Sequence, residues 1–177
     1  MVRKTKRLLI LALVSSFACS AMPSEYEYQG GGVEDLTIIK SSSGCTLEIK
    51  GSDIKYQDDE CSSVQDERIR LKSYFVFLDI PVKSLDLVSS QNDDFIETFI
   101  EHKDSINIGE VDFGNGYSVT VIRKKPISAN YKILFSKEFG IISITRNISG
   151  TEGGAIAWIL KGRCGYGGLC KKPRDTN

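Results

Sequence analysis

The sequence predicts an all-β protein: a single antiparallel sandwich or barrel with little helix, held together by two disulfide bonds. From Leu36 onward, apolar residues recur at every second position in short segments separated by turn residues, which is typical of half-buried antiparallel strands. The chain also begins like an exported protein, and its five cysteines suit an exported, disulfide-bonded domain. Its 177 residues are enough for one domain with a sizeable core.

Residues 1–18 are expected to be a signal peptide. The stretch MVRKTKR carries four cations, the apolar run LLILALV follows at 8–14, and small residues come next. A charged region, a short apolar region and a small-residue cleavage zone in this order are typical of a secretory signal. The apolar run is too short for a membrane anchor, which needs about twenty residues.

Cys19 is the expected lipidation site of a bacterial lipoprotein. The stretch SSFAC resembles a permissive lipobox, with Ala18 directly before the cysteine, although Ser16 and Phe17 depart from the usual pattern. Cleavage before Cys19 would leave Ser20 behind the lipidated cysteine, and in bacterial lipoproteins this implies export to the outer membrane, facing the periplasm. The alternative is cleavage after Ala18 or Ser20, which would give a soluble periplasmic protein.

Residues 19–34 are expected to be a flexible tether, and residues 35–177 a β domain with a C-terminal disulfide loop. The stretch SAMPSEYEYQGGG after Cys19 is polar, contains proline and ends in three glycines. This composition is typical of a linker. A mature N-terminus without a linking role is the alternative.

The four cysteines after Cys19 are expected to form two local disulfides. Four cysteines allow three connectivities, and pairing of sequence neighbours closes two short loops, Cys45 with Cys61 and Cys164 with Cys170. In the chain-entropy description, the first loop contributes about 3 kcal/mol and the second about 2 kcal/mol.

In the first half of the domain, strands are expected at 36–40, at 45–50 and from Ile54. In the second of these, Leu and Ile alternate with Glu and Lys, so one face is apolar and the other charged. Residues 68–82, RIRLKSYFVFLDIPV, are the strongest strand pattern in the chain. We expect one strand there, buried on both faces toward its end and terminated by Pro81.

In the second half, residues 93–103 fit either a helix or a strand. The turn-like HKDS and the alternation that resumes after it favour a strand. Asn115-Gly116 is expected to be a two-residue hairpin turn between alternating arms. NYKILF and IISIT, joined by SKEFG at 136–140, are expected to form another hairpin, and 153–160 the last strand. In all, roughly nine or ten strands are expected.

The formal net charge is zero, but it is unevenly distributed. Without residues 1–21, the chain has 19 basic and 23 acidic residues, a net charge of −4. Residues 161–177 carry +4, so the body at 22–160 carries −8. An acidic body argues against nucleic-acid binding, which needs a broad basic face. The basic end could prefer an anionic partner or pair with the body itself.

Few catalytic or metal-binding patterns are present. The single histidine, His102, could pair with Asp104 and a serine, but no G-x-S-x-G elbow positions a nucleophile, and a solvated histidine is the simpler interpretation. One histidine and oxidised cysteines predict neither a transition-metal site nor a thiolate nucleophile. The C-terminal glycines lack phosphate-loop spacing, so no cofactor is expected. A carboxylate pair for hydrolysis stays open, because 23 acidic residues supply many pairs.

The stretch RCGYGGLC, at 163–170, is the candidate binding site. Its glycines permit backbone angles that other residues resist, and a disulfide would hold them in one shape. Tyr166 and Leu169 are expected to project from an exposed tip beside Arg163, and a preorganised tip loses little entropy on binding. The alternative is a structural crosslink that keeps the C-terminus from fraying.

These observations predict a noncatalytic protein of the bacterial cell envelope, a lipoprotein that binds a protein partner or an envelope component in the manner of an inhibitor or immunity protein. The alternative is a periplasmic hydrolase that uses an unidentified carboxylate pair. The lipid anchor would be its contact with the membrane.

Overall fold

The computed structural model describes residues 24–63, 66–73, 75–86, 90–92, 96–124, 129–148 and 155–170. In this part of the chain the fold is all-β and antiparallel, as predicted, and its main unit is an open sheet rather than a closed barrel. No helix among these residues is long and apolar enough to cross a membrane. The strands of the sheet, in spatial order, are β4 (Lys55–Asp58), β3 (Gly44–Ile49), β2 (Leu36–Ser41), β1 (Ser24–Gly30), β14 (Ile156–Leu160), β13 (Gly140–Ile148), β12 (Ala129–Ser136), β11 (Gly116–Arg123), β8 (Ile96–Lys103) and β7 (Ser90–Asn92).

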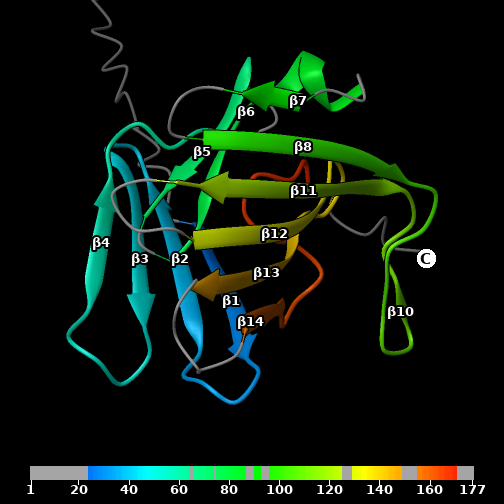
Figure 1. Cartoon of the computed structure of the whole chain (residues 1–177). Helices are drawn as coiled ribbons and strands as arrows, with labels where there is room; N and C mark the ends of the chain where they lie inside the picture. Colours follow the sequence, from blue (N-terminus) through cyan, green and yellow to red (C-terminus); the bar gives the residue numbers. More distant parts are fainter. Residues whose placement is uncertain are drawn as a thin grey trace, which may run out of the picture.

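Two hairpins and one short helical turn complete the described structure. The hairpin of β5 (Arg68–Lys72) and β6 (Phe77–Pro81) leads into the 3-10 turn η1 (Val82–Asp86). The smaller hairpin of β9 (Asn107–Ile108) and β10 (Val111–Asp112) extends from the end of β8 and β11 (Figure 1).

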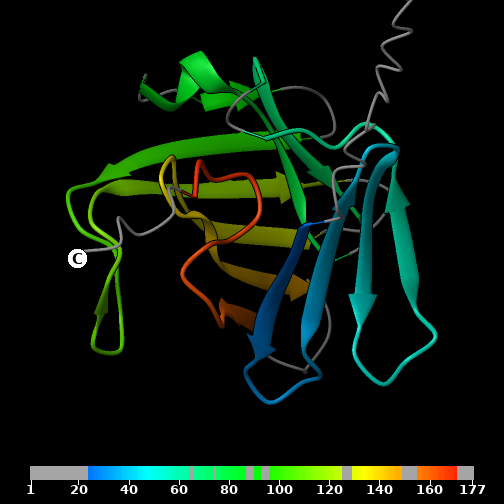
Figure 2. The ribbon, with the colours of Figure 1, turned by 180° about the vertical axis from the view of Figure 1, so that it is seen from behind.

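The sheet bends around the core. Strands β2, β3 and β4 run across the direction of β8, β11, β12 and β13, with β1 and β14 between the two groups (Figure 1). Figure 2 shows the C-terminal loop, drawn in red, on the inner side of this bend. The strand register aligns one buried side chain from each of five neighbouring strands into a row across the inner face: Ile100, Val119, Ile133, Ile144 and Trp158.

The expected tether at 19–34 contains a strand, because residues 24–30 form β1. This strand pairs with β2 on one side and β14 on the other. Its sequence SEYEYQG alternates polar residues with tyrosines, and Tyr28 is fully buried. The period-two pattern therefore outweighs the polar composition on which the tether was predicted. Residues 19–23 lie outside the described residues.

Residues 68–82 form a hairpin, so the prediction of one long strand was wrong. β5 and β6 pair so that Leu71 lies opposite Leu78 and Ile69 opposite Ile80. The turn depends on Ser73, whose Oγ accepts the backbone N–H groups of Phe75 and Val76, each at 3.1 Å. Such local side-chain hydrogen bonds compete with an extended strand.

Residues 96–103 are strand β8, as the flanking pattern predicted. Asn115-Gly116 is not a two-residue hairpin turn, because β8 pairs directly with β11 and the whole segment 104–115 is an excursion between them. Gly116 is the first residue of β11, and a Cβ there would meet the side chain of Ile106 and the carbonyl oxygen of Phe135, both at 2.5 Å. The glycine is required for this close approach.

Most of the other expected strands are confirmed, but the described residues form fourteen strands, ten of them in the main sheet, rather than nine or ten in all. β2, β3 and β4 lie where strands were expected, β12 and β13 form the expected hairpin, and β14 is the last strand. Both disulfides have the predicted pairing, Cys45 with Cys61 and Cys164 with Cys170, with Cα–Cα distances of 5.9 Å and 5.4 Å. Two disulfides indicate an oxidising compartment, periplasmic or extracellular.

Candidate functional site

The C-terminal cysteine loop, residues 163–170, is fixed against the turn between β12 and β13. Its glycines serve this contact, since a Cβ on Gly165 would collide with the backbone of Ile141, and one on Gly168 with the backbone of Gly140. The loop therefore adds backbone pairing to the turn, much as a short strand would. Four backbone hydrogen bonds make the attachment: Gly165 N–H to Phe139 O (2.7 Å), Ile141 N–H to Tyr166 O (2.9 Å), Leu169 N–H to Lys137 O (3.0 Å) and Cys170 N–H to Glu138 O (2.9 Å).

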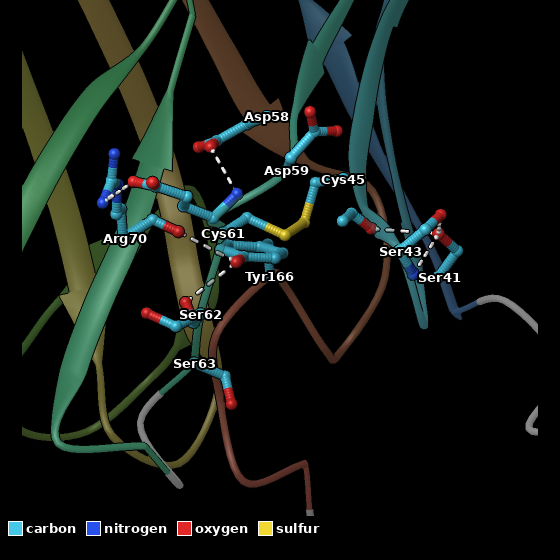
Figure 3. The surroundings of a disulfide bond; sticks show 12 residues. Ser41, Ser43, Cys45, Asp58, Asp59, Cys61, Ser62, Ser63, Arg70 and Tyr166 are labelled. Carbon is cyan, nitrogen blue, oxygen red and sulfur yellow. Dashed lines mark hydrogen bonds and ion pairs between the residues drawn. A yellow bond between two sulfur atoms is a disulfide. The ribbon is translucent and has the colours of Figure 1, made fainter.

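Tyr166 is buried, which corrects the prediction of an exposed tip. Its side chain is 0% exposed, and its ring packs edge-on against Tyr26 with the ring centroids 5.8 Å apart. Its hydroxyl donates toward two carbonyl oxygens, those of Ser62 at 2.8 Å and Arg70 at 3.0 Å. Figure 3 shows this hydroxyl between the two segments, beside the disulfide that holds Cys61. Tyr166 thus joins the cysteine loop to β5 and to the segment before it.

Tyr28 of β1 supports the same attachment through a second buried hydroxyl. Its hydroxyl accepts the backbone N–H of Tyr166 at 2.9 Å and donates to the carbonyl oxygen of Ile141 at 3.2 Å. Burial raises the pKa of Tyr28, although the hydrogen bond from the Tyr166 backbone opposes this. Burial also raises the pKa of Tyr166, and the nearby charge of Asp58 adds to the increase. Both phenols therefore stay protonated near neutral pH.

Asp58 orders the other side of the Tyr166 site. It is 7% exposed, and its carboxylate accepts the backbone N–H of Lys72 at 2.6 Å and that of Glu60 at 3.1 Å. These bonds hold the segment that contains Cys61 close to β5. A buried carboxylate needs such partners, since an unpaired one would be costly.

Leu169 is exposed, as predicted, and borders a first depression of about 400 Å³. Its side chain is 45% exposed. His102 lies in the same depression, edge-on to the Tyr117 ring at 5.6 Å, and Lys137 lies 5.8 Å from the centroid of that ring. Asn115, Ser136 and Glu138 also line this depression, so most of its lining side chains are polar.

Arg163 is also exposed and borders a second depression of about 490 Å³. The floor contains Phe113 and Phe139, whose rings meet edge-on with their centroids 5.7 Å apart. Val111 of β10 also lines this depression and is 55% exposed. These three apolar residues share no sequence motif and were not predicted, because they come together only through the β9–β10 excursion.

The described residues do not assemble a nucleophilic triad around His102. The His102 Nδ1 lies 3.5 Å from Asp104 Oδ1, and no hydrogen bond within the described structure joins this histidine to a serine. Ser136 lines the same depression, but its Oγ accepts the backbone N–H of Glu138 at 3.2 Å. No group of three or more metal-ligating side chains occurs among the described residues.

The carboxyl groups with a shifted pKa are held in their charged form. The hydrogen bond from Lys161 lowers the pKa of Asp35. That from Lys103 likewise lowers the pKa of Glu101. A general acid for hydrolysis needs the opposite shift, a raised pKa.

The remaining candidate residue, Cys19, lies outside the described residues. Fold and site together define this chain as an open antiparallel β protein with two disulfides and a fixed C-terminal loop. Neither a scan against protein-family models nor searches of curated proteins and of solved structures gave a match. The features of the described structure that bear on function are the fixed loop and the two depressions beside it.

Proposed function

We propose that this chain is a noncatalytic protein of the bacterial cell envelope that binds a protein partner or an envelope component through its loop face. The loop face consists of the exposed side chains Val111, Arg163 and Leu169 and the two depressions that they border. The proposal is carried by one observation: exposed side chains stand on a loop fixed by a disulfide, four backbone hydrogen bonds and a buried tyrosine. A surface held in this way loses little conformational entropy on binding.

The alternative, a periplasmic hydrolase, has less support. Asp66 and Glu67 both line a third depression, but Asp66 already accepts the backbone N–H of Ser63 at 2.8 Å, and the cations Arg68 and Lys83 line the same depression. A hydrolytic pair needs two carboxyl groups that face the substrate, whereas the Asp66 carboxylate is engaged by both the backbone N–H and the hydroxyl of Ser63. Binding is therefore the better supported role.

Lipidation of Cys19 is part of the proposal. The β domain begins at Ser24, five residues after Cys19, so an anchor there would hold the sheet within roughly 17 Å of the membrane surface. The tether expected at 19–34 is therefore much shorter, because residues 24–30 form β1. An outer-membrane lipoprotein facing the periplasm fits the oxidising compartment that the disulfides indicate. A soluble periplasmic protein is the alternative.

Processing of the precursor tests the anchor. Globomycin blocks the peptidase that cleaves lipoprotein signals, so it should cause a slower-migrating precursor to accumulate on an immunoblot of the producing cells. Cys19→Ser, the matched control, should remain insensitive to the drug. Normal processing of the wild-type chain in globomycin would contradict lipidation and leave the soluble alternative.

Affinity capture from envelope extracts tests the binding role. The tagged chain should retain a specific partner, and the triple variant Val111→Ser, Arg163→Gln, Leu169→Ser should lose it. Ile54→Ser is the control, because Ile54 lies on the segment between β3 and β4 and, at 48%, is about as exposed as Leu169 at 45%. Capture that is equal for the wild type and the triple variant would contradict a role for the loop face.

A further inference from the structure

The second depression of the loop face has an apolar floor of the size that a side chain could fill. Phe113 and Phe139 form the floor, Leu160 continues it at the end of β14, and Val111 forms an exposed wall. The volume of about 490 Å³ lies within the range typical of ligand sites. We call this depression the Arg163 groove. Covering its apolar surface would favour binding of an apolar side chain.

Two cations line the groove, and within the described residues one of them is available. Lys161 is committed, because its Nζ lies 2.6 Å from Asp35 Oδ2. The carboxylate in the groove, Asp112, accepts the backbone N–H of Gly114 at 2.7 Å and the hydroxyl of Ser105 at 3.2 Å. Among the described residues, no carboxylate forms an ion pair with Arg163. The groove therefore presents an apolar floor next to an available guanidinium group, which is suited to bind a carboxylate with two hydrogen bonds.

The rim of the groove also offers backbone donors. Within the described structure, the N–H groups of Gly162 and Arg163 make no hydrogen bond. The side of Gly162 is open, since a Cβ added there would meet only the backbone nitrogen of Cys164, at 4.0 Å. A peptide chain could approach this rim and offer its own carbonyl or carboxylate oxygens to these N–H groups. A fatty acid could offer only its head group, because its acyl chain carries no hydrogen-bond acceptor.

We propose that the Arg163 groove binds the C-terminus of a partner protein, with the terminal carboxylate on Arg163 and an apolar last side chain on Phe113 and Phe139. A C-terminal residue carries both chemical groups at once, which matches the adjacency of the cation and the floor. This inference rests on the proposed binding function and names the part of the partner that is recognised.

Synthetic peptides test this inference with the folded chain as it is. The probes are fluorescein-labelled Gly-Ser-Gly-Ser peptides extended by two residues that cover all combinations of Val, Leu, Ile and Phe. Each peptide is made with a free carboxylate and as the C-terminal amide, and binding is measured by fluorescence anisotropy. Some free-acid peptides should bind, and their amides should bind at least about tenfold more weakly, because a charge-assisted hydrogen bond is lost.

Two variants locate the binding. Arg163→Gln should weaken the free-acid peptides by at least about tenfold and leave the amides nearly unchanged. Gly162→Phe should abolish binding by filling the groove from its open side, and thermal unfolding checks that this variant is folded. Lys55→Gln, on the edge strand β4, is the charge control and should bind like the wild type.

Four results would overturn the inference. These are no binding by any peptide, equal binding of acids and amides, full binding by Arg163→Gln, and displacement of the peptides by laurate at lower concentration than by unlabelled peptide. The last result would assign the groove to fatty acids. If the wild type and Arg163→Gln capture the same partner from extracts, this inference fails while the binding function stands. If the wild type captures nothing, the binding function itself fails.

Discussion

Substitution of Tyr166 tests whether the cysteine loop is attached through a buried ring. Tyr166→Phe removes only the hydroxyl, which donates toward the carbonyl oxygens of Ser62 and Arg70. Each of these carbonyls also accepts a backbone N–H from the other residue, at 3.2 Å and 2.9 Å, so neither is left without a donor. The expected loss is therefore the net value of one hydrogen bond, about 1 kcal/mol, rather than the larger cost of an orphaned group.

Tyr166→Ala removes the ring as well and should cost about 3–5 kcal/mol, because the ring is fully buried and its removal leaves a cavity. The assay is urea unfolding of both variants with the disulfides intact, followed by tryptophan fluorescence of Trp158, which is itself buried. An exposed tyrosine would give a change within about 0.5 kcal/mol for both variants. A loss below about 1 kcal/mol for Tyr166→Ala would refute the buried attachment.

Two further predictions concern the same attachment. Replacing Cys164 and Cys170 together by serine should lower the free energy of unfolding in urea by about 2 kcal/mol, because their disulfide closes a short loop. The same double variant should also weaken partner capture. Unchanged stability and capture would contradict the role of this disulfide. The buried phenols predict a loss of stability in alkali. Burial raises the folded-state pKa of Tyr28 and Tyr166, so their contribution is complete below the unfolded value of about 10 and falls as the pH rises above it, where the unfolded chain ionises first. Urea unfolding at several pH values from about 9 to about 11 should show this decline in the free energy of unfolding, and the decline should be shallower for Tyr166→Phe. The same slope for the wild type and the variant would argue against the burial.

Local patterns were sufficient for most of the strands and for both disulfides. Alternation over a few residues identified β2, β3, β12 and β13, and the hairpin between β12 and β13 needed only a turn between two apolar arms. The same rule applied to residues 24–30 would have found β1, because polar residues and tyrosines alternate there. The three glycines at 30–32 suggested a linker, although the first of them is the last residue of β1.

Burial of Tyr166 could not be predicted from the loop that contains it. The groups that bind it are far away in the sequence: Tyr28 lies 138 residues before it, and Ser62 lies 104 residues before it. A tyrosine among glycines beyond the last strand is consistent with exposure as long as those partners are unknown. The hairpin at 68–82 was missed for a related reason. In the sequence, Ser73 is one polar residue within an apolar stretch, and only the structure shows that it accepts hydrogen bonds from the backbone of Phe75 and Val76.

The candidate site was predicted in part. Arg163 and Leu169 are exposed as expected, and each borders a depression. The apolar floor beside Arg163 was missed, because Phe113 and Phe139 belong to separate turns that meet only in the folded chain. Residues that act through a shared surface, rather than through a sequence motif, become visible once the topology is known.

Affinity capture with the triple variant of the loop face tests the central claim most directly. The wild-type chain and Ile54→Ser should retain the same partner from envelope extracts, and Val111→Ser, Arg163→Gln, Leu169→Ser should lose it while unfolding at the same urea concentration as the wild type. Retention of that partner by the folded triple variant would contradict the assignment of binding to this face.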